Sequence, residues 1–451
     1  MSELAVVVLA AGMGTRMKSS LPKVLHKAAG RTLLAHVLHA VKPLTPSHVV
    51  VVHGPGAPHE PAKTVAAKIM PGCLFAEQAE RKGTGHAVMM AEQMLQGFKG
   101  TVLVLYGDAP LLRPESLTAL LGKLGKAHPM AVLGFEAAVP TGYGRLLLRG
   151  KNIRAIREEK DASAKERKTT LCNSGIVAIA SKHLWPILHK LKPANAQGEL
   201  YLTDVVELMV KAGHKVALAT CPEEDVAGVN DRVQLAHVEG VFQKRLRTEA
   251  MLKGATLLDP RSVHLCADTK IGTDVVIEPN VVFGPGVTIG DNVEILAHSH
   301  IEGATIGKGA RVGPFARLRP GAEIGENAHV GNYVEVKKAK LGKGAKVNHL
   351  TYIGDAEVGA GSNIGAGTIT CNYDGFEKHV TKIGENVFVG SNTALVAPVS
   401  VGDGANIAAG SVITSDVPAD ALAMTRAPLT QKEGWAKRYR AIKAAKKQSK
   451  S

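Results

Sequence analysis

The most regular alternation of apolar and polar positions lies in the C-terminal half of the chain, where it repeats every six residues from residue 271 to about residue 413. A branched apolar residue opens each hexad and a small residue often stands four positions later, so two side chains per hexad point inward. The fourth positions are residues that reach a left-handed backbone conformation cheaply: Asp274, Asn280, Gly286, Asn292, Gly309, Asn327, Gly344, Gly361, Asn386 and Gly404. Each hexad therefore predicts one short strand and one corner, and three hexads close a triangular coil of a parallel β-helix.

Interruptions of this repeat indicate where a binding face is expected. Three sides are shortened to five residues, at 301–305, 336–340 and 353–357. At 370–382, thirteen residues replace a single hexad, so a loop must leave the coils. Because insertions in such solenoids gather on the binding face, this stretch is a candidate site. The repeat alone leaves open a passive spacer or an oligomerisation rod.

The N-terminal half shows another pattern, in which short apolar runs alternate with amphipathic stretches. Strands are predicted at 4–10, 49–53 and 101–105, and helices at 32–41, at 63–70 and from residue 83 onward. This alternation predicts an α/β domain with a Rossmann-like sheet.

A long helix is expected between the two halves. Apolar residues with helical spacing are Leu235, Val238, Phe242 and Leu246. Asp231 is suited to cap this helix, and Gly254 to end it. The predicted organisation is an α/β domain at 1–230, a helical linker at 231–253, and a β-helix with a basic tail at 254–451.

The first predicted strand is followed by a glycine turn and two cations, Arg16 and Lys23, which is an arrangement that holds phosphates. A dinucleotide fingerprint is excluded, since Met17 stands at its third glycine and no acid occurs between Glu3 and Glu60. A P-loop is excluded because no Gly-Lys-Ser/Thr closes the turn. Asp108 follows a later buried strand and, beside a triphosphate, is a natural Mg²⁺ ligand.

Composition narrows the partners. The net charge of +15 favours an anionic partner, but only 4% of residues are aromatic and no recognition helix is evident, so phosphorylated small molecules fit better than nucleic acid. Five scattered cysteines argue for a reducing compartment and against a zinc site. With no export signal and no apolar run near ~20 residues, we expect a cytoplasmic protein without a membrane partner. Disorder is the default expectation for the last ten or so residues.

Two resemblances enter at this point. The stretch 9–17 followed by Pro22-Lys23 is similar to the signature of sugar-1-phosphate nucleotidylyltransferases, and the hexad region resembles the left-handed β-helix of the hexapeptide-repeat acyltransferases. Together with the pieces Gln78, Gly83-Thr84, Tyr106-Gly107-Asp108, 141–145, Glu158, Asn173 and Gly228-Val229-Asn230, the chain resembles the bacterial bifunctional UDP-N-acetylglucosamine pyrophosphorylase/glucosamine-1-phosphate acetyltransferases. This resemblance covers nearly the whole chain.

For the N-terminal half, the resemblance implies transfer of UMP from UTP to N-acetylglucosamine-1-phosphate. The implied nucleotide and sugar ligands are Leu9, Ala10, Ala11, Gly12, Lys23, Gln78, Gly83, Thr84, Tyr106, Gly107, Asp108, Gly144, Glu158, Asn173 and Asn230. Asp108 and Asn230 would ligate Mg²⁺, and Arg16 and Lys23 would supply catalytic positive charge. Arg81-Lys82 is interpreted as a solvated turn.

For the C-terminal half, the resemblance implies that His349 is the base for acetylation of glucosamine-1-phosphate by acetyl-CoA. The implied sugar-phosphate ligands are Arg319, Lys337, Tyr352 and Asn363, and the implied acetyl-CoA ligands are Ala366, Asn372, Tyr373, Ser391, Ala409 and Arg426. We further hypothesise that Glu335 orients the base, and take Cys371 as a packing residue rather than an acyl carrier. The family also implies a homotrimer.

The expected protein is thus a two-headed enzyme whose product, UDP-N-acetylglucosamine, feeds bacterial cell-wall and lipopolysaccharide synthesis. One alternative is a nucleotidylyltransferase whose β-helix only assembles or regulates. A second alternative is a non-catalytic scaffold or exchange-factor subunit with the same two folds.

Overall fold

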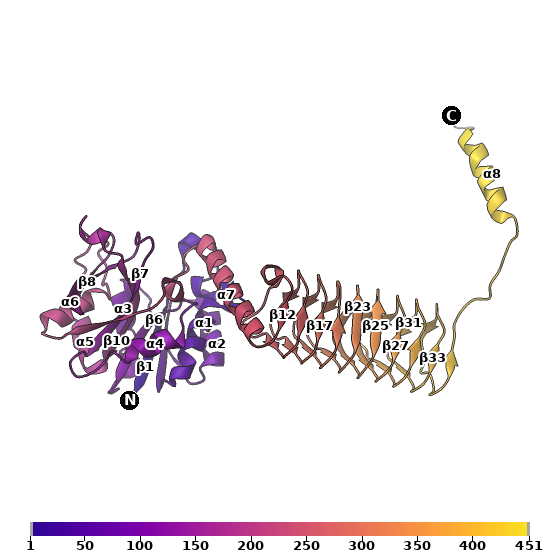
Figure 1. Ribbon diagram of the computed structural model, residues 1–451, viewed down its shortest axis with the longest axis horizontal. Helices are drawn as coiled ribbons and strands as arrows, with labels where there is room; N and C mark the ends of the chain where they lie inside the picture. The colour runs from indigo at the N-terminus through magenta and orange to yellow at the C-terminus, as the bar shows by residue number, and fades with distance from the viewer. Residues whose placement is uncertain (1–2, 449–451) are drawn as a thin grey trace. The chain divides into compact units, whose positions relative to one another are not determined.

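The computed structural model describes residues 3–448, and its contacts divide the chain into two compact units. The first unit runs to residue 249 and includes 265–267, and the second comprises 250–264 and the chain from 268 onward. Figure 1 shows the layered α/β arrangement of the first unit and the stacked coils of the second. Among the described residues, no helix combines the length and apolar character that crossing a membrane requires.

A nine-stranded mixed sheet forms the centre of the first unit. Its strands, in spatial order, are β5 (Leu74–Glu77), β4 (His48–His53), β1 (Leu4–Ala10), β6 (Thr101–Tyr106), β10 (Leu171–Ala180), β7 (Met130–Glu136), β11 (Val216–Thr220), β9 (Asn152–Arg157) and β8 (Arg145–Arg149). Strands β5, β4, β1 and β6 run parallel to one another, and β10 runs antiparallel to its two neighbours, β6 and β7. The predicted strands at 4–10, 49–53 and 101–105 are confirmed.

The helices of this unit join successive strands and cover the sheet. They are α1 (Leu33–Val41), α2 (Glu60–Ile69), α3 (Thr84–Met89), α4 (Pro114–Leu121), α5 (Ser181–Leu188), α6 (Asp204–Lys211) and α7 (Arg232–Leu252), which continues into the second unit. A short hairpin pairs β2 (Lys27–Ala28) with β3 (Arg31–Thr32). Single 3₁₀ turns are η1 (Thr15–Met17), η2 (Lys23–Leu25), η3 (Lys42–Leu44), η4 (Ala57–His59), η5 (Gln93–Leu95), η6 (Glu166–Lys168), η7 (Glu223–Val226) and, in the second unit, η8 (Pro260–Ser262).

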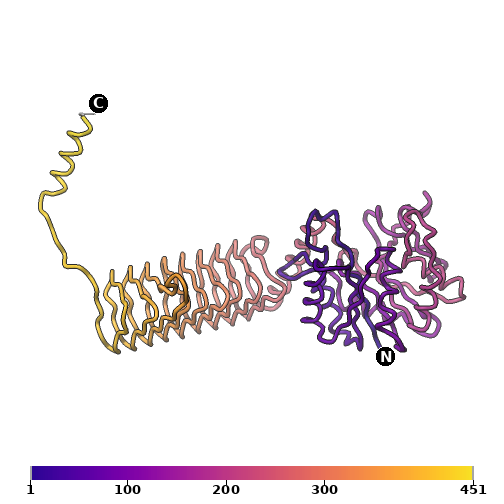
Figure 2. Tube along the Cα trace, turned by 180° about the vertical axis from the view of Figure 1, so that it is seen from behind, coloured from indigo at the N-terminus to yellow at the C-terminus, as the bar shows by residue number. Residues whose placement is uncertain are grey.

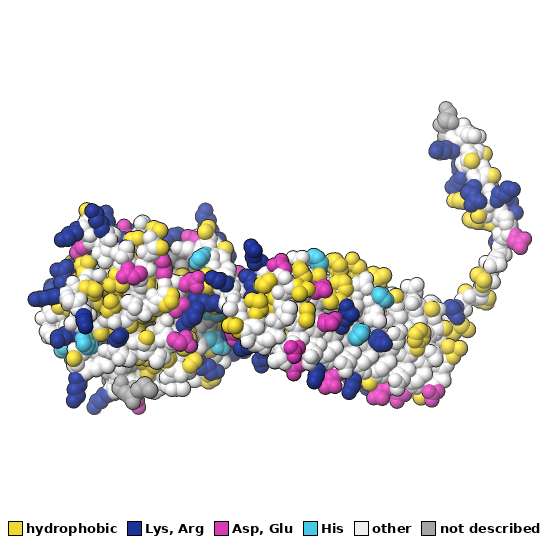
Figure 3. Space-filling model, in the orientation of Figure 1, with side chains coloured by type: hydrophobic (Ala, Val, Ile, Leu, Met, Phe, Trp, Pro, Cys, Tyr) yellow, Lys and Arg dark blue, Asp and Glu magenta, His cyan; other side chains and the backbone are white. Residues whose placement is uncertain are grey.

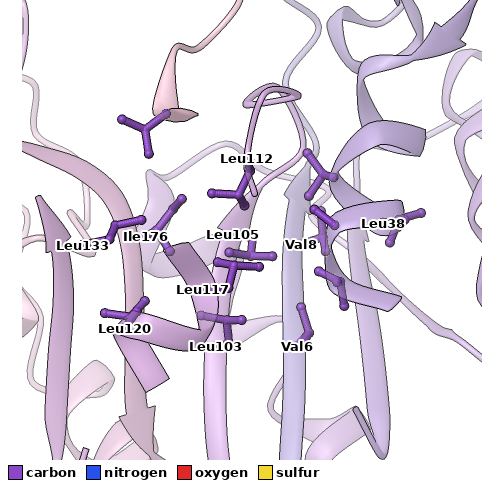
Figure 4. Packing of buried hydrophobic residues seen from close by; sticks show 14 of the residues in the cluster. Val6, Val8, Leu38, Leu103, Leu105, Leu112, Leu117, Leu120, Leu133 and Ile176 are labelled. Atoms are coloured by element: carbon purple, nitrogen blue, oxygen red, sulfur yellow. The ribbon is translucent and has the colours of Figure 1, made fainter. Parts of the chain in front are cut away.

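The sheet is buried on both faces, which explains why its strands are almost wholly apolar. Successive side chains of a strand point to opposite faces, so Val6 and Val8 of β1 join one core and Val7 joins the other. Figure 4 shows Val6 and Val8 beside Leu103 and Leu105 of β6, with α1 and α4 contributing further leucines. Each fully buried aliphatic side chain contributes roughly 2 kcal/mol to stability, so this core fixes the strand ends that carry the site.

Helix α7 begins and ends as the sequence predicts. The Asp231 carboxylate accepts a hydrogen bond from the backbone N–H of Gln234 at 2.8 Å, and Gly254 ends the segment with φ of 99°. Val238 and Val241 are buried against the first unit, so most of this helix is packed rather than free-standing.

The second unit is a parallel β-helix with three faces. The first face is a ten-stranded sheet of β12 (Thr256–Leu257), β14 (Val276–Ile277), β17 (Glu294–Ile295), β20 (Arg311–Val312), β23 (His329–Asn332), β25 (Lys346–His349), β27 (Asn363–Ile364), β30 (Phe388–Val389), β33 (Asn406–Ile407) and β35 (Leu422–Ala423). The second is β13 (Lys270–Ile271), β16 (Thr288–Ile289), β19 (Ala304–Ile306), β22 (Ala322–Ile324), β29 (Thr381–Ile383) and β32 (Val399–Val401). The third is β15 (Val282–Phe283), β18 (His300–Ile301), β21 (Arg317–Leu318), β28 (Ile369–Cys371), β31 (Ala394–Val396) and β34 (Val412–Ile413). Strands β24 (Glu335–Leu341) and β26 (Tyr352–Val358) pass from the third face to the second without a break.

The register of the coils confirms the repeat and its interruptions. Partners on successive coils are 18 residues apart, as Val276 and Glu294 are, and 17 apart where a side is shortened, as Glu335 and Tyr352 are. All ten predicted corner residues have left-handed backbone conformations, with φ from 53° to 77°. The three parallel sheets and their hexad register are consistent with the left-handed β-helix that the resemblance implies.

Two segments depart from the coils. The inserted segment separates Asn363 from its partner Phe388 by 25 residues, and Figure 2 shows it leaving the regular stack as a loop. Near the C-terminus the structure forms α8 (Trp435–Gln448), so the expectation of disorder is wrong for the part of that segment up to residue 448. The remaining residues, 449–451, lie outside the described ones.

Candidate active sites

A cavity of about 230 Å³ in the first unit lies at the carboxyl ends of β1 and β6, where ligands collect in open α/β sheets. Nine residues expected from the sequence line it: Leu9, Ala11, Gly12, Lys23, Gln78, Gly83, Thr84, Tyr106 and Asp108. It is also lined by Val24, Arg81, Ala87 and Glu199, which the sequence reasoning did not assign to the site. Arg81 and Lys82 are both exposed, as the interpretation of a solvated turn requires, although Arg81 also borders the cavity.

The glycine loop holds Lys23 against the cavity. Gly14 has φ of 70°, and a Cβ there would lie only 2.7 Å from the Lys23 Cβ, so a larger residue would displace the lysine. Arg16 is exposed on the neighbouring 3₁₀ turn and does not line the cavity. Lys23 therefore borders the cavity, whereas a catalytic role of Arg16 stays a prediction.

Asp108 and Asn230 converge on one cation position. The Lys23 ammonium forms an ion pair with the Asp108 carboxylate and donates to the Asn230 side-chain oxygen at 3.0 Å. A carboxylate and an amide oxygen are hard donors of the kind that Mg²⁺ prefers, so these residues fit the metal. Among the described residues no group of three or more His, Cys, Asp or Glu side chains is arranged for a metal, so phosphate oxygens and water would have to complete the coordination.

The expected uracil side of the cavity is tied to the segment before α6. The Gln78 amide donates to the Gly83 carbonyl at 3.2 Å. The Thr84 hydroxyl accepts from the Leu202 N–H at 3.0 Å, and burial strongly raises the pKa of the neighbouring Tyr106. These hydrogen bonds within the chain hold Gln78 and Thr84 in place at the cavity.

Gly144, Glu158 and Asn173 also come together. A Cβ on Gly144 would lie 3.2 Å from both Glu158 carboxylate oxygens, and the Asn173 N–H donates to the Gly144 carbonyl at 2.8 Å. Burial raises the pKa of the Glu158 carboxyl. The expected ligands that do not line the cavity are Ala10, Gly107, Gly144, Glu158, Asn173 and Asn230. Gly107 instead donates from its N–H to the Leu9 carbonyl at 2.9 Å.

The second candidate site lies at one edge of the β-helix, where the first face meets the third. His349 is exposed at the end of β25, and its Nδ1 lies 2.8 Å from the Asn332 side-chain oxygen one coil earlier. An amide oxygen can only accept, so this contact places the proton on Nδ1 and leaves the Nε2 lone pair free to act as a base. Asn332 was not predicted, although its position 17 residues before His349 was a readable signal.

Cations gather on the adjoining third face. Arg319 forms an ion pair with Glu335 at 2.8 Å, so the role of Glu335 in orienting or charge-tuning His349 stays a hypothesis. Lys337 lies in register with Gly354 on the next coil. The Tyr352 hydroxyl lies over Gly354, where it would meet an added Cβ. Proximity to the Lys337 ammonium lowers the pKa of Lys378, a residue of the inserted loop that the sequence reasoning missed.

The expected acetyl-CoA residues follow the same edge, one per coil. Backbone hydrogen bonds place Ala366 one coil beyond His349, Ser391 beyond Ala366, and Ala409 beyond Ser391. Ser391 and Ala409 line a cavity of about 520 Å³ on the first face. A Cβ on Gly410 would lie 3.7 Å from the Arg426 side chain, which therefore stands at the end of this line.

The remaining expected ligands of this site lie nearby in the fold. Asn363 occupies the first face one coil beyond β25, in register with Lys346. Asn372 is buried, and its amide donates to the Asp355 carboxylate. Tyr373 is exposed at the base of the inserted loop.

Comparison with known families agrees with this two-part arrangement. The MobA-like NTP transferase domain matches residues 6–204, and the bacterial transferase hexapeptide (six repeats) matches 268–303, 303–338 and 381–415. Fold and sites together define a nucleotidyltransferase joined to a hexapeptide transferase.

Relatives of full length are also found. Proteins described as "Bifunctional protein GlmU" are 53% identical in Xanthobacter autotrophicus, over 98% of this chain and 99% of the relative, and 54% identical in Rhodospirillum rubrum, over 98% of each. A third, from Paramagnetospirillum magneticum, is 53% identical over 100% of this chain and 99% of its own length. The chain therefore belongs to the GlmU family of bifunctional proteins, with a uridylyltransferase and an acetyltransferase function.

Proposed function

We propose that this enzyme acetylates glucosamine-1-phosphate with acetyl-CoA at the β-helix edge and then couples the product to UTP in the α/β cavity. The products would be UDP-N-acetylglucosamine and pyrophosphate. The observation that carries the proposal is the separation of two chemistries: phosphate-directed cations in the first unit, and an oriented imidazole in the second.

In the first reaction site, a phosphate oxygen of the sugar attacks the α-phosphorus of UTP, and the bond to pyrophosphate breaks. Catalysis by the chain is then positioning and charge neutralisation. Arg16 and Lys23 would neutralise the phosphates, while Gly144, Glu158 and Asn173 would hold the N-acetylglucosamine moiety.

Magnesium is proposed for the position between Asp108 and Asn230. A bound Mg²⁺ would neutralise charge on the triphosphate. The support is that Lys23 already places a positive charge there, between two oxygen donors. On metal binding the lysine would be free to turn toward the phosphates.

In the second site, the amine of glucosamine-1-phosphate attacks the acetyl thioester, and His349 Nε2 takes a proton from the nitrogen as the thiolate leaves. Asn332 would hold the imidazole in the tautomer that this step needs. Arg319, Lys337 and Lys378 would bind the sugar phosphate, since Arg319 and Lys337 lie on neighbouring coils and Lys378 of the inserted loop lies near Lys337.

The edge beyond His349 is proposed as the acetyl-CoA track. Its residues are small at Ala366, Ser391 and Ala409, so an extended ligand arm can lie along it. Four steps of about 4.8 Å place Arg426 roughly 20 Å from His349, where it would meet the CoA phosphates.

Self-association, expected as a homotrimer, is proposed for the β-helix. The same edge, up to and including the coil of His349, carries His298, Phe315, Tyr333 and Leu350, all held at left-handed φ values. Phe315, Tyr333 and Leu350 are 44%, 57% and 64% exposed. A left-handed backbone costs roughly 1 kcal/mol for such residues, and covering their apolar surface with a second copy would offset that strain. Figure 3 shows hydrophobic side chains gathered over the earlier coils on the visible face.

The decisive experiment is a coupled assay with purified protein. Glucosamine-1-phosphate and N-acetylglucosamine-1-phosphate are each supplied with UTP, with and without acetyl-CoA and Mg²⁺. Pyrophosphate release from the non-acetylated sugar is expected only when acetyl-CoA is present. Equal release without acetyl-CoA would contradict the order of reactions, and no CoA release under any condition would contradict the acetyltransferase assignment.

A further inference from the structure

The inserted loop of the β-helix is a folded hairpin. Tyr373 and Lys378 form an antiparallel bridge at its base, and the His379 N–H donates to the Asn372 carbonyl at 2.9 Å. The Tyr373 hydroxyl donates to the Gly375 carbonyl at 2.6 Å. The loop therefore has one defined conformation that presents Lys378 from a fixed base.

Asp374 holds the tip of this hairpin together. Its Oδ1 accepts hydrogen bonds from the backbone N–H groups of Phe376 at 2.8 Å and Glu377 at 2.7 Å, and its Oδ2 lies 2.8 Å from His379 Nε2. The Glu377 N–H, His379 and the Phe376 N–H together hold the pKa of the Asp374 carboxyl well below its usual range. The carboxylate is thus ionised at neutral pH, and His379 is the only side chain bonded to it among the described residues.

This hairpin brings the positive charge of Lys378 close to that of Lys337. The base of the hairpin is anchored next to Lys337, because the Asn372 amide donates to the Asp355 carboxylate and the preceding residue, Gly354, is the register partner of Lys337. Lys378 therefore lies near Lys337, whose ammonium lowers the pKa of Lys378. Two ammonium groups held side by side form a ready position for a phosphate dianion, but they separate unless the backbone holds them. The contacts within the hairpin are what oppose that separation.

We propose that the Asp374–His379 pair is a positioning device that keeps Lys378 beside Lys337, so that both lysines meet the phosphate of the acetyl acceptor. His379 and Asp374 touch neither substrate and act through Lys378. This inference rests on the proposed acetylation of a sugar phosphate at the β-helix edge. It adds to that function the residues that organise its phosphate site.

The test is a comparison of full-length variants in acetyl transfer, with the concentration of glucosamine-1-phosphate varied. His379→Ala is expected to raise KM for the sugar phosphate about fivefold while kcat changes less than about twofold, since the lost interaction acts on substrate binding. His379→Gln, which keeps an N–H donor for Asp374, should return KM most of the way to the wild-type value. Glu377→Gln is the matched control, because its exposed side chain has no part in the hairpin contacts, and wild-type constants are expected.

A double-variant cycle separates positioning from simple loop damage. Because His379 acts through Lys378, adding His379→Ala to a Lys378→Ala protein should raise KM no further. A further rise in the double variant, or an unchanged KM in His379→Ala, would overturn the proposal. A fall in kcat that His379→Gln does not restore would do the same.

Failure of the underlying function would look different. A wild-type protein that releases no CoA with glucosamine-1-phosphate would refute acetyl transfer itself, whatever the variants do. Uridylyl transfer is measured for every variant and should stay at the wild-type rate, which shows that each protein is folded.

Discussion

The two sites differ in how completely one chain builds them. The proposed nucleotide cavity is bordered by strand ends, a glycine loop and helix α3, and its lining residues Leu9, Ala11 and Gln78 are almost wholly buried, whereas Gly12 and Arg81 are exposed. The proposed acetyl-transfer site lies on an outer edge, where His349, Ser391 and Arg426 are exposed. Several elements of one unit contribute residues around the first site, whereas one β-helix contributes only one exposed surface to the second.

This difference has a chemical reason. Electrostatic stabilisation of a transition state is stronger where water is excluded, so an acyl-transfer site needs a covering wall. Stacked coils with flat faces cannot provide one, because every side chain either points into the prism or out to solvent. The exposed, strained corner residues before His349 indicate where another copy would supply the wall. The comparison therefore predicts that the first activity is independent of assembly and the second is not.

The strongest way to separate the sites is to remove the base. His349→Ala should lower acetyl transfer by about 10³-fold, within the range for loss of a general base. Uridylyl transfer from N-acetylglucosamine-1-phosphate should be unchanged. Both rates are measured on the same preparation by CoA release and pyrophosphate release, and an equal loss of both would refute two separate sites.

The converse change tests the metal position. Asp108→Ala should lower uridylyl transfer by about 10²-fold and shift the Mg²⁺ requirement to higher concentration, because one of two protein oxygen donors is lost. Acetyl transfer should remain at the wild-type rate. A variant with undiminished Mg²⁺-dependent pyrophosphate release would reject the role of Asp108.

The corner residues test whether the second site needs a second chain. Tyr333→Asp places a charge at the centre of the exposed apolar edge and should dissociate the assembly. Acetyl transfer is then expected to fall about 30-fold while uridylyl transfer persists, with oligomeric state followed by solution mass. Lys343→Asp changes charge at an exposed position away from this edge and serves as the control. Monomeric Tyr333→Asp protein with full acetyl transfer would show that one chain suffices.

The sequence predicts the regular parts of this molecule well for a local reason. A left-handed corner requires Gly, Asn or Asp nearly everywhere, so the fourth position of each hexad reveals the coil, and all ten predicted corners occur. The rule failed at His298, Phe315, Tyr333 and Leu350, which adopt the same backbone although their side chains disfavour it. The backbone conformation of those residues depends on contacts between coils and on their surroundings at the surface. A six-residue pattern shows neither.

The site residues divide in the same way. Those of the nucleotide cavity lie in short contiguous motifs, and nine of them converge as predicted. Asn332 and Lys378 were not predicted, because their spatial neighbours, His349 and Lys337, are distant in the sequence. A spacing of 17 residues identifies Asn332 once the coil length is known, but the hairpin that brings Lys378 to Lys337 follows no period.

The smallest expected effect concerns the half-buried carboxyl of Glu158, which lies beside Gly144 in the first unit. Burial raises the pKa of Glu158 above that of the unfolded chain, so the folded state binds its proton more tightly and stability falls as pH rises between those two values. Glu158→Gln removes this pH dependence, and its unfolding midpoint should exceed the wild-type one by about 2 °C at pH 8, with the difference closing below about pH 4.

The same variant should raise KM for N-acetylglucosamine-1-phosphate about tenfold, because a carboxylate that would accept hydrogen bonds from the sugar hydroxyls is lost. Acetyl transfer, which takes place at the exposed edge, should not respond. Thermal unfolding at several pH values and uridylyl kinetics measure the two effects. Lower stability with an unchanged KM would mean that Glu158 is a structural group, and that the first unit recognises its sugar through other contacts.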